Sequence, residues 1–485
     1  MLKPKQIAVL CLGCIMVCLG HARGADWLHA GLLYDHFPLT LDDGQRTEAV
    51  GPLFYSEEKD TQKTWALPPL FADTTDPALD SSEYDFLYPV LTYRRYGQEH
   101  RWQFIQIFSF AGGQNPDEQK AKRLTLFPFY FRQRSEEPDQ DYTAVFPFYG
   151  HLKNRLFRDE IFFKMFPVYS RTRKGDIVTT NWGYPVFSVR RGNGLEGWKL
   201  WPFYGWEHKE VTTRTNGFGD VETVEGYRSW FTMWPFVLDK TSGIGTENLT
   251  RQHAVLLVYG HEHSPKRDSK SVIWPFFTHT IDREKKYEER DMPWPLIVFA
   301  RGEGKTTSRV WPFYSRAHNQ YLESDWYFWP VYKYNRVHAD PADRSRMRIL
   351  FFLYSDMIQK NTETGQAERR VDLWPLFTHK RDFNGNTRLQ LFAPLEPILP
   401  NNRSIEREYS QVWSVWRAEK NAKTGAASQS LLWNLYRHES TPTSKKCSLL
   451  FGLFQYQSGT AGKRMRLFYI PVMSVKPTPA KAEAK

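Results

Sequence analysis

Residues 326–334 read Trp-Tyr-Phe-Trp-Pro-Val-Tyr-Lys-Tyr, so that one proline stands among aromatic and apolar side chains. Successive side chains of a β-strand point to opposite faces. One face of the run would then carry Trp326, Phe328, Pro330, Tyr332 and Tyr334, and the other Tyr327, Trp329, Val331 and Lys333. Alternation of bulky residues over such a length is typical of a strand. These residues therefore predict a β-strand with a proline near its centre.

An aromatic-proline box like the one at 329–330 recurs along the whole chain, mostly at steps of about 17–20 residues. The boxes are built on Pro128, Pro147, Pro167, Trp201 with Pro202, Trp234 with Pro235, Trp274 with Pro275, Trp294 with Pro295, Trp311 with Pro312, Trp329 with Pro330, and Trp374 with Pro375. Where a step is twice as long, an aromatic or apolar run without proline lies near its midpoint, at 107–110, 255–259 and 350–354. From Pro38 onward the period of about 20 residues gives about 23 units. A fixed period indicates a repeat protein whose units pack against their neighbours.

Polar turn residues separate the boxes, for example at 175–176, 192–194 and 384–386. The connections are too short for crossover helices, so neighbouring strands should be antiparallel. The sequence predicts an all-β fold: an antiparallel up-and-down meander of about 22–23 strand units. One longer loop is expected at 216–220, where the step between Pro202 and Pro235 is irregular.

Proline at the centre of a strand cannot donate a ladder hydrogen bond and is normally confined to edges or bulges. We therefore expect a bulge or bend at each box, so that each unit consists of two short strands that meet at the proline. The flanking aromatic residues would then pack one to each face. The alternative is that some boxes are strand starts rather than centres.

Two architectures are compatible with a meander of this length. The export signal described below, the strand number and the aromatic content of 16% favour a large barrel or barrel-like structure of the outer membrane. The alternative is a propeller or a sandwich. Two observations argue against the barrel: Arg309 and Arg316 bracket a short box, and prolines would leave carbonyls unsatisfied in hydrocarbon. Of the two, the barrel is the favoured prediction.

The N-terminus has the pattern of a secretory signal peptide over residues 1–24, in which two lysines precede the apolar run 7–19 and small residues follow. A single β-repeat domain is predicted for residues 25–475, and a flexible Lys/Pro/Ala-rich tail for 476–485. Three of the four cysteines lie in the signal segment, which leaves Cys447 and no internal disulfide. Lipidation at Cys14 is an alternative reading of the same segment. Export without disulfides indicates the outer membrane or periplasm of a Gram-negative-type bacterium.

The formal net charge is +11, and basic residues commonly follow the boxes, as at Arg316, Lys333 and Lys380. In a meander this spacing predicts cationic belts at the sheet rims, where they would meet a membrane, anionic envelope lipid or polysaccharide. The alternative is that strand ends simply need soluble residues. Nucleic acid is not expected as a partner, because export removes the protein from it.

His261, Glu262 and His263 are the densest group of candidate metal ligands, since alternate histidines on a strand share one face. No third ligand is evident, and a solvated loop after Tyr259 and Gly260 is the favoured interpretation. Histidines such as His279 and His318 occupy the same positions after the boxes as Arg and Lys do elsewhere. The sequence therefore predicts no metal site and no cofactor.

Catalytic motifs are absent from the sequence: it contains no phosphate-binding glycine loop, no Gly-x-Ser-x-Gly elbow and no Cys-His pair in a catalytic context. Acidic pairs such as Glu136–Glu137 and Glu288–Glu289 lie in turn-like polar segments. We therefore expect a non-enzymatic, exported envelope protein with a structural role or a role in the passage of a solute or polymer. The alternatives are a soluble glycan- or protein-binding module, and a hydrolase whose active site lies on loops.

Overall fold

The computed structural model describes residues 28–114, 122–135, 138–215, 220–460 and 462–475. The predicted signal segment 1–24 and tail 476–485 lie outside these residues. The chain divides into two compact units: unit 1 comprises Met1–Ala78, Asn386–Phe392 and Asn402–Lys485, and unit 2 comprises Leu79–Gly385 and Ala393–Asn401. The described residues of both units are almost entirely β-structure. The period of aromatic boxes runs through both.

Unit 2 consists of short strands that follow one another along the chain. They are β7 (Ser81–Phe86), β8 (Leu91–Tyr96), β9 (Glu99–Phe104), β10 (Phe108–Gln114), β11 (Lys122–Phe127), β12 (Tyr130–Arg134), β13 (Tyr142–Val145), β14 (Tyr149–Arg155), β15 (Arg158–Lys164), β16 (Tyr169–Lys174), β17 (Ile177–Trp182), β18 (Phe187–Gly192), β19 (Leu195–Leu200), β20 (Tyr204–Lys209), β21 (Thr212–Thr215), β22 (Val221–Val224), β23 (Gly226–Thr232), β24 (Val237–Ile244), β25 (Thr250–Val255), β26 (Tyr259–His263), β27 (Arg267–Val272), β28 (Phe277–Asp282), β29 (Tyr287–Asp291), β30 (Ile297–Gly302), β31 (Thr306–Val310), β32 (Tyr314–His318), β33 (Leu322–Tyr327), β34 (Tyr332–Ala339), β35 (Ala342–Ile349), β36 (Tyr354–Asn361), β37 (Ala367–Leu373) and β38 (Phe377–Arg381).

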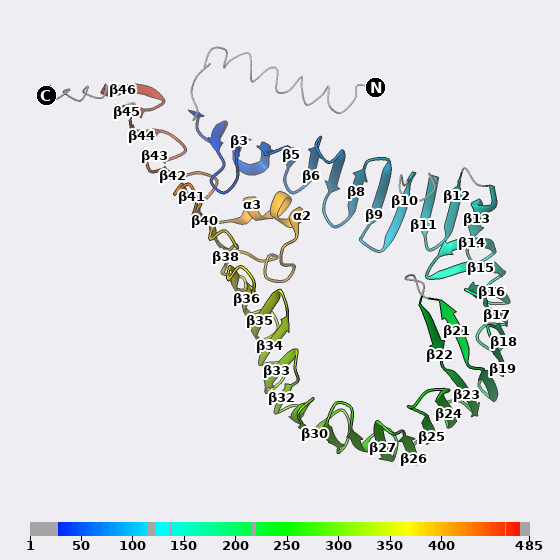
Figure 1. Ribbon diagram of the computed structural model, residues 1–485. Helices are drawn as coiled ribbons and strands as arrows, with labels where there is room; N and C mark the ends of the chain where they lie inside the picture. The colour runs from blue at the N-terminus through cyan, green and yellow to red at the C-terminus, as the bar shows by residue number, and fades with distance from the viewer. Residues whose placement is uncertain (1–27, 115–121, 136–137, 216–219, 461, 476–485) are drawn as a thin grey trace. The chain divides into compact units, whose positions relative to one another are not determined.

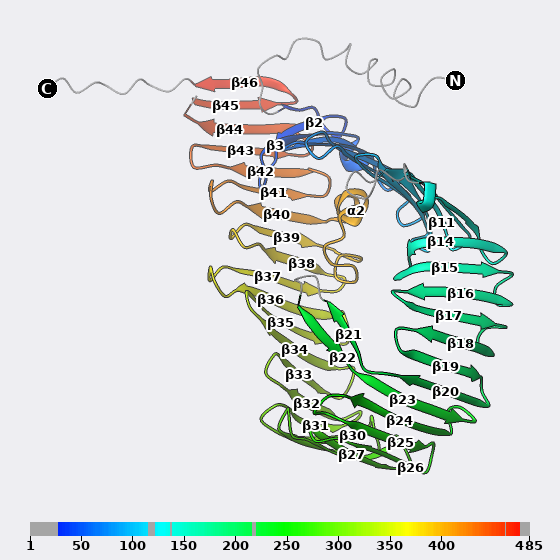
Figure 2. The same ribbon diagram turned by 45° about the vertical axis from the view of Figure 1, so that its right-hand side comes forward.

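These strands confirm the predicted antiparallel up-and-down meander. Each strand pairs antiparallel with the next one along the chain, for instance β14 with β15, β15 with β16 and β16 with β17. Figure 2 shows this run of strands side by side. The exception is the pair β21–β22, which forms a separate hairpin between β20 and β23. The longer loop expected at 216–220 would lie between β21 and β22, and residues 216–219 of it lie outside the described part.

The aromatic-proline boxes are turns, which corrects the predicted position of proline within a continuing strand. At the box of Pro128 the amide of Phe129 donates to the carbonyl of Leu126, and the chain reverses from β11 into β12. The peptide bond before Pro128 is cis, as it is at the other boxes of unit 2 that carry proline, and this is the geometry of a type VI turn. In such a turn the missing N–H of proline falls at a position that the ladder does not use.

Each period of about 20 residues therefore contributes two strands rather than one. Part of the prediction holds, because two short strands do meet at each proline, but they fold back on each other instead of continuing through a bend. The three runs without proline behave in the same way: residues 105–107, 256–258 and 350–353 are also turns. Box turns alternate with polar turns along the chain, so all box turns of unit 2 lie at the same end of the strands. Together they form one border of the sheet, which runs across the strand ends. We call this the box edge.

Unit 1 is built from two runs of strands and a short helical segment. The first run is β1 (Leu28–His29), β2 (Asp35–Pro38), β3 (Gly44–Ala49), β4 (Phe54–Lys59), β5 (Gln62–Leu67) and β6 (Phe71–Asp76). The second is β39 (Thr387–Leu391), β40 (Trp416–Lys420), β41 (Ala427–Leu431), β42 (Tyr436–Ser440), β43 (Ser444–Leu449), β44 (Phe454–Gly459), β45 (Gly462–Leu467) and β46 (Ile470–Val475), with α2 (Arg403–Ile405) and α3 (Gln411–Trp413) between β39 and β40. Figure 1 shows α2 and α3 in orange.

Hydrogen bonds join the two runs of unit 1 across long sequence separations. The Tyr55 hydroxyl donates to the carbonyl of Arg407 at 3.0 Å, and the Thr40 hydroxyl donates to Ser428 at 2.6 Å. The buried apolar cluster beside them is small and consists of Tyr55, Ala66 and Ala72. The interior of unit 1 is therefore largely polar.

The core of unit 2 is also small, and its largest apolar cluster lies over β12–β15. It contains Phe131, Tyr142, Ala144, Leu152 and Phe163, all less than 10% exposed. Gly150 makes room for this cluster, because a Cβ at that position would lie 2.4 Å from the Ala144 Cβ and 2.6 Å from the Phe163 ring. Most other strand positions are half-exposed, so the sheet is stabilised mainly by its ladders and by pairs of side chains on neighbouring strands.

Asp291, at the end of β29, is a buried acid whose ionisation opposes folding. Burial, followed by the charge of Glu289, raises the pKa of Asp291 to about 6. Its Oδ1 atom has no hydrogen-bond partner among the described residues. Below about pH 4 the carboxyl is protonated in both the folded and the unfolded chain, whereas above pH 6 the folded chain must hold the buried charge.

We therefore predict that Asp291→Asn raises the free energy of unfolding at pH 7 and leaves it unchanged at pH 3.5. Urea denaturation at a series of pH values, followed by fluorescence, measures the difference between variant and wild type. The gain should develop between about pH 4 and 6, the interval between the unfolded and folded pKa values. A gain that does not depend on pH would contradict this explanation.

Candidate functional surface

At several boxes the aromatic residue before the proline packs against an aromatic residue of the next box turn. The ring centroids of Phe146 and Phe166 are 5.5 Å apart, and those of Phe166 and Tyr184 are 5.7 Å apart. Further pairs of this kind are Trp201 with Trp234, Trp311 with Trp329, Trp329 with Phe351, and Phe352 with Trp374. The box edge is therefore a line of turns held together by their own rings.

At the box of Pro275 the aromatic side chain lies over a small residue of a neighbouring strand. A Cβ at Gly260 would lie 2.5 Å from the Cδ1 atom of Trp274, so the indole of that box occupies the space above the glycine. Ser271 is a buried small residue directly across from Gly260 in the ladder. Trp274 thus covers one face of the sheet at this position.

The residue after each box proline points outward, and its side chain is exposed. Exposure of these side chains ranges from 39% at Phe276 to 62% at Val168. The others are Phe129, Phe148, Val186, Phe203, Phe236, Leu296, Phe313, Val331 and Leu376. The box edge therefore presents an exposed apolar side chain at each of these turns. Such surfaces mark interaction sites.

A second row, apolar except for Lys164 and Thr232, lies next to the box edge on one face of the sheet. We call it the edge band. Its members are direct cross-strand partners, so their side chains share one face. From β11 to β28 they are Leu126, Tyr130, Val145, Tyr149, Lys164, Tyr169, Trp182, Phe187, Leu200, Tyr204, Thr232, Val237, Val255, Tyr259, Val272 and Phe277. From β30 to β38 they are Ile297, Val310, Tyr314, Tyr327, Tyr332, Ile349, Tyr354, Leu373 and Phe377.

The opposite edge of the sheet has a different composition. Its turns are mostly polar, such as 175–176, 193–194 and 283–286. Leu156, Phe157 and Tyr321 are exceptions, and they are 55%, 97% and 62% exposed. The two edges of unit 2 therefore differ in polarity, with aromatic turns on one and polar turns on the other.

Basic residues that follow the boxes lie within strands, and several pair with acidic residues. Arg173 lies 3.0 Å from Glu160 on the preceding strand, and Lys380 lies 3.2 Å from Glu368. Arg190 of β18 reaches Glu207 of β20 at 2.9 Å across Gly197, which has no side chain in the way. The structure thus gives these cations partners within the sheet, and cationic belts stay a prediction.

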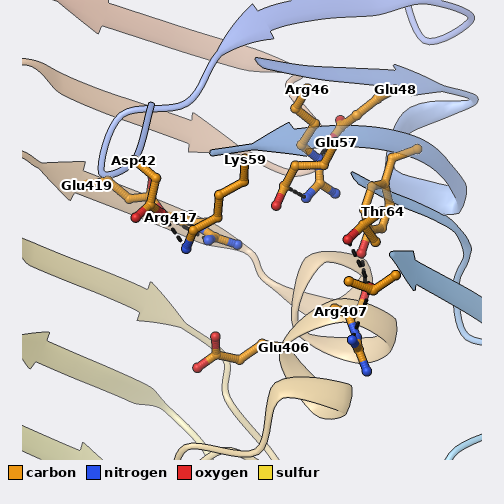
Figure 3. A network of polar contacts seen from close by, with 12 residues as sticks. Asp42, Arg46, Glu48, Glu57, Lys59, Thr64, Glu406, Arg407, Arg417 and Glu419 are labelled. Carbon is orange, nitrogen blue, oxygen red and sulfur yellow. Dashed lines mark hydrogen bonds and ion pairs between the residues drawn. The ribbon is translucent and has the colours of Figure 1, made fainter. Parts of the chain in front are cut away.

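Unit 1 contains a buried network of ion pairs, drawn in Figure 3. Arg46 of β3 donates to Glu48 at 2.7 Å and to Glu57 at 3.1 Å, and its guanidinium lies 3.7 Å from the centre of the Tyr55 ring. Burial lowers the pKa of Arg46, but Glu48 and Glu57 outweigh it, so the pKa is raised. Burial raises the pKa of Tyr55 to about 12. The guanidinium is therefore charged in the folded chain.

The network continues into the second run of strands. Asn434 donates to Asp35 at 3.0 Å and to Glu48 at 3.1 Å, and Arg437 lies 3.4 Å above the ring of Phe37. Glu419 pairs with Arg417 at 2.8 Å and with Arg388 at 3.0 Å. Burial acts to raise the pKa of Glu419, but the two arginines outweigh it and lower the pKa to about 2. Asn434 and Arg437 thus join β2 and β3 to β42 and the turn before it, and the pairs of Glu419 join β39 to β40.

A short sequence pattern underlies many of these ion pairs, and it was not among the features used for prediction. On four strands an arginine pairs with an acid two residues later, and the pair is buried or nearly so: Arg46–Glu48, Arg370–Asp372, Arg417–Glu419 and Arg437–Glu439. Arg158 and Glu160 of β15 have the same spacing, and there Glu160 pairs with Arg173 of the next strand. Residues i and i+2 of a strand share a face, so the spacing predicts a contact between them. The pattern alone does not distinguish a buried pair from an exposed one such as Glu288–Arg290.

The structure places the candidate metal ligands on strands rather than in a loop, which corrects that prediction. His261 and His263 belong to β26, because residues 259–263 pair with β25 on one side and β27 on the other. His279 and His318 also lie on strands and face acids on the next strand, Glu288 and Asp325 respectively. Neighbouring strands thus bring histidines and carboxylates together.

A groove of about 440 Å³ lies on the sheet over β18–β20. It is lined by Phe187, Val189, Arg191, Glu196, Gly197, Trp198 and Trp206. The two indoles are direct cross-strand partners, and Trp198 is 42% exposed. Aromatic faces beside an arginine and a glutamate are able to stack on and hydrogen-bond to a polar ring.

The chain matches no protein-family model, and no curated protein matches it significantly. None of the described helices has the length and apolar character needed to cross a bilayer. The fold defines the class of protein: an antiparallel β-repeat in which aromatic hairpin turns line one sheet edge.

Proposed function

We propose that this chain is a non-enzymatic, exported β-repeat protein of the bacterial envelope that attaches to a membrane surface through its box edge. The observation that carries the proposal is the difference between the two edges of unit 2. Box turns expose Phe, Trp, Val and Leu along one edge, while the other edge is mostly polar. Aromatic side chains with a polar environment behind them are enriched where apolar and aqueous phases meet.

The chemistry of the strands supports attachment rather than insertion. Membrane-spanning β-strands need about 9–11 residues, whereas the strands of unit 2 range from four residues in β13 to eight in β34. Some also carry a charged row on one face, as with Arg344, Arg346 and Arg348 on β35. These features favour a peripheral protein over the large barrel predicted from the sequence, and a structural role over the passage of a solute or polymer.

A protein that binds at the surface of a bilayer inserts its apolar side chains only to a shallow depth. The side chains after the box prolines and the edge band form two adjacent apolar rows, and inserting them would leave the rest of the sheet in water. The binding strength of such a surface grows with the apolar area that is buried. Basic residues such as Arg132 and Arg171, near the box edge, would add attraction to anionic headgroups.

The experiment is flotation of the purified protein with vesicles of phosphatidylethanolamine and phosphatidylglycerol. We expect the protein to float with the vesicles and a substantial part of the binding to persist in 1 M salt, because apolar insertion is not screened. Extraction of cell membranes with carbonate should release it, as for a peripheral protein. Resistance to carbonate together with heat-modifiable gel mobility would instead support the barrel.

Glycan binding is the second candidate function, and the groove over β18–β20 favours it. The indoles of Trp198 and Trp206 provide a stacking platform, and Arg191 and Glu196 provide hydrogen-bonding groups at its rim. A protein that fails to float but is retained on an immobilised polysaccharide, with retention lost in Trp198→Ala, would move the function to this groove.

A further inference from the structure

The strands β26 and β27 bring three metal-ligating side chains together on one face of the sheet. The Nε2 atom of His261 lies 3.2 Å from Oδ1 of Asp268, and the Nδ1 atom of His263 lies 3.3 Å from Oδ2 of the same carboxylate. The ligand atoms of the three residues all lie within 4.8 Å of one another. Asp268 is the direct cross-strand partner of His263, and His261 lies two residues away on the same face.

We propose that His261, His263 and Asp268 form a binding site for Zn²⁺. This inference is independent of the membrane attachment proposed above. Two imidazoles and one carboxylate are ligands that zinc takes readily, and three protein ligands leave one position open for water or an external ligand. In a tetrahedral site with ligand distances of about 2.0–2.1 Å, neighbouring ligand atoms are about 3.3 Å apart. Each imidazole nitrogen lies at close to that distance from one oxygen of Asp268, His261 from Oδ1 and His263 from Oδ2.

The backbone holds these ligands in place. β26 pairs with β25 and β27 on its two sides, so the three ligands rest on hydrogen-bonded strands rather than on a loop. The imidazoles of His261 and His263 have their ring centroids 5.9 Å apart, as expected for alternate residues of a strand. Zinc binding would replace the contacts between the imidazoles and the carboxylate with bonds to the ion, without a change in strand register.

The surroundings predict an exchangeable site rather than a structural one. The side chains of His261, His263 and Asp268 are 31%, 59% and 21% exposed, so water reaches the ion. Lys270 and Arg251 are cross-strand neighbours of His261 and His263 and oppose a cation. Glu262 points to the other face, where it lies 3.9 Å from Arg267. One carboxylate therefore carries the charge compensation of this site.

A second cluster on the same sheet serves as a matched comparison. His318 of β32 lies 3.7 Å from Glu323 and 3.0 Å from Asp325 of β33. This cluster has one nitrogen ligand where the proposed site has two, and zinc prefers nitrogen and sulfur donors to oxygen donors. The proposed site should therefore be the tighter of the two.

The test is titration of the metal-free full-length protein, without an affinity tag, with Zn²⁺ in competition with a chromophoric chelator. We expect one equivalent of tightly bound zinc. His263→Ala should weaken this site by at least about tenfold, since loss of even an outer-shell partner has an effect of that size. His318→Ala should leave the tight site unchanged. Co²⁺ in place of zinc should give the visible absorption of a four-coordinate ion, which His261→Ala abolishes.

Two results would overturn the proposal. One is wild-type protein that binds zinc no more tightly than the variant His261→Ala/His263→Ala. The other is loss of the tight site in His318→Ala with retention in His263→Ala. Circular dichroism spectra of the variants show whether each keeps its fold, and vesicle flotation of His263→Ala, expected to be unchanged, separates this site from the membrane-binding edge.

Discussion

Substitution of Arg46 by alanine is expected to lower the free energy of unfolding of unit 1 by about 3–5 kcal/mol, the usual cost of removing one partner of a buried ion pair. The Arg46 side chain is 7% exposed and pairs with Glu48 and Glu57. Its loss leaves the Glu48 carboxylate, itself 6% exposed, buried without its cation. It also removes the contact between the guanidinium and the Tyr55 ring.

Urea denaturation measures this loss, and hydrogen exchange of the β3 and β4 amides locates it in unit 1. The control is Lys63→Ala, which breaks the exposed Lys63–Glu58 pair between β4 and β5 and should leave stability at the wild-type value. A second variant, Arg46→Met with Glu48→Gln, removes both charges and should recover part of the loss. Equal effects of Arg46→Ala and Lys63→Ala would show that the network does not stabilise the fold.

Replacement of four exposed box residues by serine is expected to lower the binding constant for vesicles by at least about a hundredfold. The residues are Phe148, Phe203, Phe236 and Phe313, each at least 50% exposed and each directly after a box proline. A half-exposed ring gains roughly 1 kcal/mol on entering an apolar environment, and the sum for four rings exceeds the free energy of a hundredfold change. The rings point away from the sheet, so the fold should be retained.

Flotation with vesicles over a range of lipid concentrations gives the binding constants. The matched control is Phe157→Ser with Tyr321→Ser, which removes two exposed rings from the opposite edge. This control should bind like wild type, because the opposite edge does not enter the membrane. If both variants lose binding equally, general hydrophobicity rather than the box edge would explain attachment, and unchanged binding of the first variant would contradict the proposal.

The predicted and the observed structure differ most at the box prolines. The side chains on both sides of Pro330 alternate in the same way whether the strand continues through the box or folds back on itself. The alternation therefore does not reveal the direction of the chain after the proline. The sequence therefore predicted the residues of both strands, but it placed the two strands in one line through the proline and missed the reversal. The amide of Val331 donates to the carbonyl of Phe328 at 2.7 Å, which closes the turn that only the structure reveals.

For the candidate zinc site, too, the sequence predicted only part of the arrangement. The shared face of His261 and His263 follows from their spacing, but the third ligand does not. Asp268 reaches them because the turn 264–266 sets the register of β27 against β26. A shift of one residue would place Asp268 on the other face, since strand side chains alternate.

The buried network of unit 1 is the feature that the sequence predicts least. Its contacts join residues far apart along the chain, such as Asn434 with Asp35, separated by 399 positions. The pattern of Arg46-x-Glu48 and Arg437-x-Glu439 is local, but burial of these pairs depends on how the two runs of strands pack.

The amino-acid sequence by itself determined the all-β class, the repeat period, the antiparallel meander and the positions of the runs without proline. These features depend on side-chain alternation and turn chemistry, which act between residues close together in the chain. Tertiary structure alone decided that the boxes form one apolar edge, that Asp268 joins two histidines, and that a set of charged residues is buried in unit 1. Those features depend on strand register and on contacts between segments that lie far apart in the sequence.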